Sequence, residues 1–87
     1  MMFHITYQFS TDHRKASQNR FKETGAPPVA GITMHGRWHC AQSHKGFLIV
    51  ESDEAEAIAT WIQQWSDLMT FEVTPVITDE ELARVID

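Results

Sequence analysis

The alternation of apolar and polar side chains predicts four strands. Residues 2–9 alternate strictly between the two kinds, which is typical of a half-buried strand. The segments 32–40, 46–51 and 70–77 are predicted to be three further strands, and a loop at 41–45 joins the middle two as a hairpin.

Helical spacing accounts for the chain between these strands. Residues 12–24 are mostly polar with Phe21 as their anchor, so we expect a surface helix that Ser10 or Thr11 caps and Gly25 ends. A second helix is predicted to begin at Ser52 or Asp53. Its apolar residues recur at spacings of three and four, which makes a broad face toward a core: Ala55, Ile58, Ala59, Ile62, Trp65 and Met69.

A short last helix is predicted after the fourth strand. Thr78-Asp79-Glu80-Glu81 has the form of a capping box, and Leu82, Val85 and Ile86 give this helix something to bury.

The order of these elements predicts the fold class. Strand, helix, strand, strand, helix, strand is the split βαβ arrangement of a ferredoxin-like α+β domain, with one four-stranded antiparallel sheet and two helices on one face. We expect residues 1–87 to form this single domain, because 87 residues enclose only one core.

The face of the sheet away from the helices has an unusual composition. If the apolar side faces the helices, the open face carries His4, His35, Arg37, His39 and Glu72 together with Phe47 and Ile49, whereas Trp38 and Cys40 face the helices. Such a mixture favours a face covered by a second copy of the chain. Gly36 leaves an alternative open, since a bulge there would exchange Arg37 and His39 with Trp38 and Cys40.

Charge and composition exclude several classes. Net charge is -5, which argues against nucleic acid as the main partner. No apolar run approaches the roughly 20 residues that cross a bilayer, and no signal peptide is evident, so we expect a soluble, cytoplasmic protein with no membrane partner. Cys40 is the only cysteine, and no nucleotide-binding, serine-hydrolase or paired-cysteine motif is present, so no cofactor is expected.

Several segments resemble a known family. They are Met2 to Tyr7, Arg20 to Gly25 with Pro27-Pro28, Gly36 to His39, Gln64 to Met69, and Phe71 to Val76. Together they are similar to a family of small proteins known only as a domain of unknown function, number three thousand three hundred and three in that series. The resemblance implies the dimeric α+β barrel superfamily, in which two ferredoxin-like sheets pack face to face. It implies no activity, because that superfamily includes cofactor-free monooxygenases, lactone isomerases, haem-degrading enzymes and ligand-binding proteins.

The candidate site therefore depends on residue chemistry. We expect a homodimer that binds a small, partly apolar organic ligand in a cavity at the sheet. The polar contacts would be Arg37, His39, His4 and Glu72, and the apolar walls would be Phe47, Ile49 and Trp38.

Two alternatives remain open. One is a cofactor-free oxygenase or isomerase in which His39 or His4 transfers a proton. The other is a structural or regulatory dimer in which Arg37 pairs with Glu51 or Glu72. No metal site is expected, since His35 and His39 would stand roughly 13 Å apart on a strand.

Overall fold

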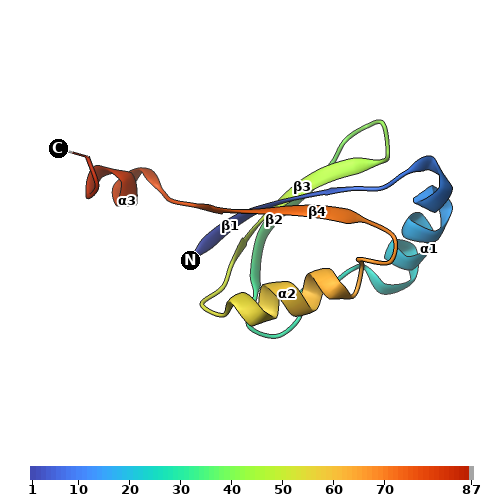
Figure 1. The fold of residues 1–87 in the computed structure, drawn as a ribbon, viewed down its shortest axis with the longest axis horizontal. Helices are drawn as coiled ribbons and strands as arrows, with labels where there is room; N and C mark the ends of the chain where they lie inside the picture. The colour runs from blue at the N-terminus through green and yellow to red at the C-terminus, as the bar shows by residue number, and fades with distance from the viewer. Residues whose placement is uncertain (87) are drawn as a thin grey trace.

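Four antiparallel strands form one sheet in the order β2-β3-β1-β4 (Figure 1). The structure is a computed structural model that describes residues 1–86, so Asp87, the last residue of the predicted domain, lies outside it. The strands are β1 (Met2–Gln8), β2 (Thr33–His39), β3 (Lys45–Glu51) and β4 (Thr70–Val76). This confirms the predicted α+β class and the ferredoxin-like order of elements.

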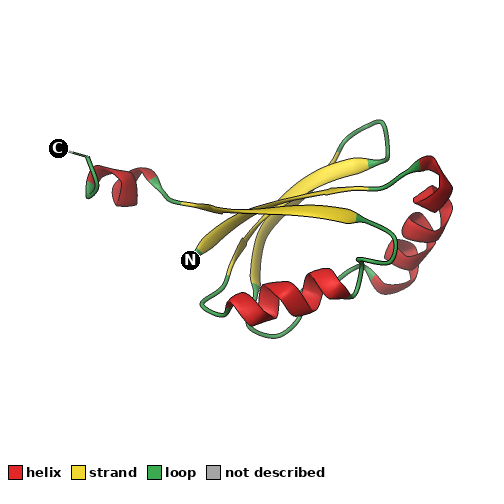
Figure 2. Ribbon diagram, viewed as in Figure 1, coloured by secondary structure: helices red, strands yellow, loops and turns green. Residues whose placement is uncertain are grey.

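Two helices lie on the same side of this sheet, as Figure 2 shows. A 3-10 turn, η1 (Thr11–His13), leads into α1 (Arg14–Thr24), and α2 (Ala55–Gln63) follows β3. The short helix α3 (Asp79–Ala83) stands apart from the sheet at the end of β4 (Figure 1).

The core lies between the sheet and α2. Its buried members come from β1, β3 and α2, and they are Phe3, Ile5, Leu48, Val50, Ile58 and Trp61. Val50 is 0% and Ile5 1% exposed, and full burial of one such side chain stabilises the fold by about 1.5–3 kcal/mol. The alternation in β1 and β3 therefore predicted their buried faces correctly.

A bulge in β2 decides which residues face the helices. Met34 pairs with Val50 but Gly36 pairs with Ile49, so one extra residue is inserted at His35. After the bulge, Arg37 pairs with Leu48 on the helix side, and Trp38 pairs with Phe47 on the open side. The faces first expected for Arg37, His39 and Trp38 were therefore wrong, and the alternative raised by Gly36 is correct for these three residues. Cys40 follows the end of β2 and still lines the helix-side cavity.

The helix ends agree with the sequence in part. Gly25 ends α1 with a left-handed φ of 72°, and Thr78 and Glu81 form the predicted capping box. Helix α2 begins later than expected, with Glu54 as its N-cap, because the hydroxyl of Ser52 instead forms a local turn by accepting from the Glu54 amide at 3.1 Å.

Within one copy of the chain, α3 does not bury its apolar residues, contrary to expectation. Leu82, Val85 and Ile86 are 44%, 75% and 62% exposed. Within residues 1–86, the core and the side chains packed against it include no residue that follows Phe71 in the sequence. The capping signal formed the helix locally, but it carried no information on what the helix packs against.

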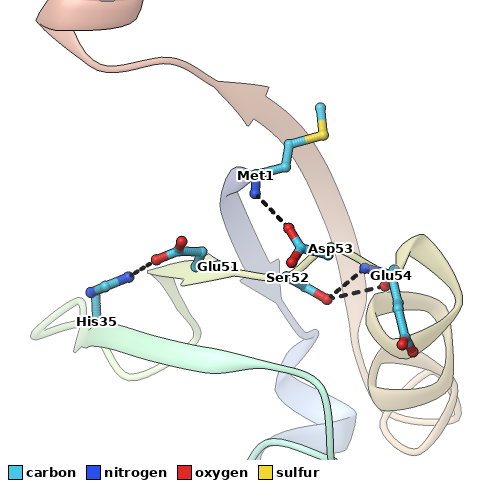
Figure 3. A network of polar contacts seen from close by, with 6 residues as sticks. All are labelled: Met1, His35, Glu51, Ser52, Asp53 and Glu54. Carbon is cyan, nitrogen blue, oxygen red and sulfur yellow. Dashed lines mark hydrogen bonds and ion pairs between the residues drawn. The ribbon is translucent and has the colours of Figure 1, made fainter.

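One end of the sheet carries a group of acidic residues, drawn in Figure 3. The Glu51 carboxylate, at the end of β3, accepts from Nε2 of His35 at 2.9 Å. The terminal ammonium of Met1 lies 3.5 Å from Asp53. Glu51 is thus paired with His35 of its own chain, and Arg37 makes no pair with it.

Candidate functional site

A cavity of about 310 Å³ lies between the sheet and the helices. Its apolar walls come from β1, β3 and β4, from α1 and α2, and from the segment that follows α2, and they include Ile5, Leu48, Phe71, Phe21, Trp61, Ile62, Trp65 and Met69. Its titratable lining is Tyr7, Arg37, His39 and Cys40. An apolar cavity with a few convergent polar groups is the usual form of a small-molecule site.

Tyr7 and His39 form a polar pair in the lining of this cavity, with Tyr7 half-buried and His39 exposed. They lie on β1 and β2, with β3 between them, and both pair with Gly46 of β3. A Cβ on residue 46 would collide with the Tyr7 ring and would lie 2.5 Å from the backbone oxygen of Trp38. Because Gly46 has no side chain, the Tyr7 hydroxyl can cross the middle strand and bond Nδ1 of His39 at 2.5 Å.

The surroundings keep both partners of this pair uncharged near neutral pH. Burial raises the pKa of Tyr7 above 10.0, with a further contribution from Cys40. Burial also lowers the pKa of His39 below 6.5, and the positive charge of Arg37 lowers it further. A neutral imidazole can accept a proton, and a neutral phenol can donate a hydrogen bond.

Arg37 is held mainly by the backbone beside α1. Its Nη1 donates to the carbonyl of Ala26 at 2.8 Å, and its Nη2 donates to the carbonyl of Gly25 at 3.0 Å. The guanidinium carbon also lies 5.0 Å from the centre of the Phe21 ring. These contacts close the wall of the cavity and leave Arg37 a positive charge beside the Tyr7–His39 pair.

The other candidate residues lie on the open face. His4, Phe47 and Glu72 line a second hollow there, and Trp38 stacks on Phe47 with ring centres 5.3 Å apart. Ile49 has the same strand parity as Phe47. The hollow is also bounded by exposed Gln8, Lys45 and Thr70, so it is open surface in one copy of the chain.

The structure thus divides the candidate set between two faces. Arg37 and His39 come together in the helix-side cavity, and His4, Glu72, Trp38, Phe47 and Ile49 remain on the opposite side. Sequence reasoning missed Tyr7, which it treated as part of the apolar face. The available signal was Gly46, the one residue of β3 that leaves room above it for a neighbouring ring.

Two further observations concern metals and membranes. Among residues 1–86, no three His, Cys, Asp or Glu side chains gather where they could hold a metal ion. No helix in this part of the chain has the length and apolarity to cross a bilayer.

The fold and the cavity define a small ferredoxin-like α+β protein with an aromatic pocket between its sheet and its helices. The chain belongs to the family described as Domain of unknown function (DUF3303), whose family model matches residues 1–87. A comparison with functionally curated proteins found no match. The family assignment confirms the resemblance found in the sequence.

Proposed function

We propose that this protein binds a small, partly apolar organic molecule in the helix-side cavity. The observation that carries the proposal is the Tyr7–His39 pair, which is placed in a cavity otherwise lined mostly by aromatic and aliphatic side chains. A volume of about 310 Å³ is at the small end of ligand sites, so the ligand is no larger than one or two fused rings.

The polar groups favour a ligand with one weakly acidic or hydrogen-bonding end. That end would meet Tyr7 and His39, and the apolar remainder would lie against Trp61, Trp65 and Phe71. The positive charge of Arg37 nearby would favour a phenol or enol over an amine.

Binding can be tested with 2-naphthol as the probe, with native mass spectrometry of freshly purified protein as a search for a co-purified molecule. We expect His39→Gln to weaken probe binding about 2–10-fold, the range for loss of one hydrogen bond. His4→Gln is the matched control, because His4 is a histidine on the opposite face. If His4→Gln weakens binding and His39→Gln does not, the site is on the open face and the proposal is wrong.

An enzyme of the cofactor-free oxygenase or isomerase kind is the second candidate. It is favoured by the state of His39: in the neutral tautomer that donates its Nδ1 proton to the Tyr7 oxygen, Tyr7 fixes the ring and Nε2 is free to take a proton from a bound molecule. Of the two histidines proposed as proton-transfer groups, His39 is the one in the cavity. Any turnover found by substrate screening should be lost in His39→Ala and kept in His4→Ala; turnover that survives His39→Ala would overturn this candidate.

We also propose that the protein is a homodimer in which a second copy covers the open face. The support is the exposure of Trp38 and Phe47, 52% and 39%, on a sheet face that carries no helix. Light scattering at micromolar concentration should give twice the mass of 10.0 kDa. A stable monomer would contradict the dimer. A dimer that binds neither 2-naphthol nor any co-purified molecule would favour the purely structural alternative.

A further inference from the structure

The segment from Ile77 to Ile86, here called the C-terminal arm, is an ordered element with nothing packed on its apolar side. Thr78 accepts from the Glu81 amide at 3.1 Å, and the Glu81 carboxylate accepts from the Thr78 amide at the same distance. Ile77 and Leu82 occupy the two positions of a hydrophobic staple, one before the cap and one in the second turn. The arm is therefore built to be a helix.

This helix is too short to be stable alone in water. Isolated helices below about 12–15 residues are marginal, whereas α3 spans only Asp79–Ala83. Leu82 lies in α3, and Val85 and Ile86 lie in the turn after it, where their amides donate to the Leu82 carbonyl at 2.9 and 3.1 Å. Their spacing of three and four on this turn places the three side chains on one side of the arm, and all three are exposed. Another surface must cover that side if the helix is to persist.

The end of the sheet nearest the arm is a poor surface for it. Val76 pairs with Met2, and Met2 pairs with Glu51, so the arm leaves the sheet beside the acidic group of Figure 3. The arm is itself acidic in its first turn, with Asp79, Glu80 and Glu81. Repulsion between these like charges disfavours folding back onto the same end.

The opposite corner of the sheet has the complementary properties. The arm follows β4 at one edge, and Trp38 lies near the far end of β2 at the other edge, so the two are diagonal corners. Exposed Trp38 and Phe47 form an apolar pair there, and Lys45 follows the same strand parity as Phe47. This corner offers apolar area with a positive charge, and the arm offers apolar area with negative charge.

We propose that the arm packs on this corner of a second copy of the chain, in a reciprocal exchange. In this arrangement the open faces of two copies pack together around a two-fold axis, and the axis runs along the other diagonal of the sheet. The corner at the end of β4 in each copy then lies against the corner at the end of β2 in its partner. The side of each arm that carries Leu82 then packs against the partner's Trp38. The acidic residues of the arm lie toward the partner's Lys45. The inference rests on the proposed dimer and adds its second contact.

The test is the dimer dissociation constant of full-length variants, measured by analytical ultracentrifugation. Leu82→Asp should raise it by about a hundredfold or more, because each dimer loses two leucine side chains from the contact. Ala83→Asp is the matched control, since it adds the same charge to the same helix on another side and should leave the constant within a few fold. Lys45→Glu should weaken the dimer, and adding Asp79→Lys should restore it.

The outcomes separate the arm from the face contact. Thr6→Arg, at the centre of the open face, should break the dimer through the face alone. If it does so while Leu82→Asp and Ala83→Asp behave alike, the face dimer stands and the arm inference is overturned. If the unmodified protein is a monomer, both the face dimer and the arm inference are overturned. That result also covers the case in which the arm binds a different protein.

Discussion

Replacement of Gly46 by alanine tests the link between the sheet and the Tyr7–His39 pair. The added Cβ would lie 2.5 Å from the backbone oxygen of Trp38 and would overlap the Tyr7 ring. Ordinary contacts of carbon are about 3.5–4 Å, so the Tyr7 ring and the backbone at Trp38 must both move by about 1 Å. Movement of the ring breaks the bond to His39.

The cost of Gly46→Ala can be worked from these contacts. Overpacking costs about 1–3 kcal/mol, and loss of a part-exposed hydrogen bond adds about 0.5 kcal/mol. Alanine also restricts the unfolded chain more than glycine does, which stabilises the folded state by about 0.4–1 kcal/mol. The free energy of unfolding should therefore fall by about 0.5–3 kcal/mol, the sum of these contributions.

Two measurements check this prediction. Urea unfolding followed by tryptophan fluorescence gives the loss of stability, and NMR titration gives the pKa of His39. That pKa should rise toward 6.5 when the Tyr7 ring no longer shields the imidazole.

Gly31→Ala is the control for this prediction. Gly31 has a φ of +92° and no atom nearer than 3.5 Å to an added Cβ, so its substitution mainly strains the backbone, by about 1–2 kcal/mol. It should leave the pKa of His39 unchanged. Unchanged stability and an unchanged His39 titration in Gly46→Ala would refute the reasoning.

Three further predictions follow from burial and from charge. Because the pKa of His39 in the folded protein is below 6.5, the unfolded chain binds more protons as pH drops from about 7 toward 5, and the urea midpoint should fall. The midpoint should fall less in His39→Gln, and an equal dependence on pH in the two proteins would contradict this prediction. Thr78→Ala removes the hydroxyl that accepts from the Glu81 amide but keeps the backbone amide that donates to the Glu81 carboxylate, so the pKa of Glu81 should rise only part of the way toward 4.5 in an NMR titration; an unmoved pKa would count against the box. Ile5→Ala, at a side chain only 1% exposed, should lower the free energy of unfolding by about 2–5 kcal/mol in urea, and a loss below about 1 kcal/mol would mean that the core is not where the structure places it.

The sequence predicted the fold well because each strand and helix carries its own periodic signal. The alternation of β1 identified Ile5 as buried, and the spacing of apolar residues in α2 identified Ile58. Gly25 and Thr78 are local signals that depend on a few neighbouring residues, and both acted as expected. Such features need no knowledge of the rest of the chain.

The candidate site was harder to predict because it depends on how strands pair. Gly36 indicated that a bulge was possible, but only the pairing of β2 with β3 shows that the extra residue is His35. That one residue moved Arg37 and His39 to the other face. The role of Tyr7 depends on Gly46, which is adjacent only in the folded sheet. The exposure of Leu82 likewise depends on what lies near α3 in space.

The two edges of the sheet determine how this protein can associate with other chains. An edge strand presents unpaired amide and carbonyl groups that can recruit a strand from a neighbouring molecule. At one edge β4 contains Pro75, which has no amide hydrogen to offer, and at the other edge the bulge in β2 interrupts the regular ladder. Both edges therefore resist strand-by-strand growth into fibrils. The open face of the sheet, with Trp38 and Phe47 exposed on it, can then remain uncovered in a single chain without promoting aggregation through the edge strands.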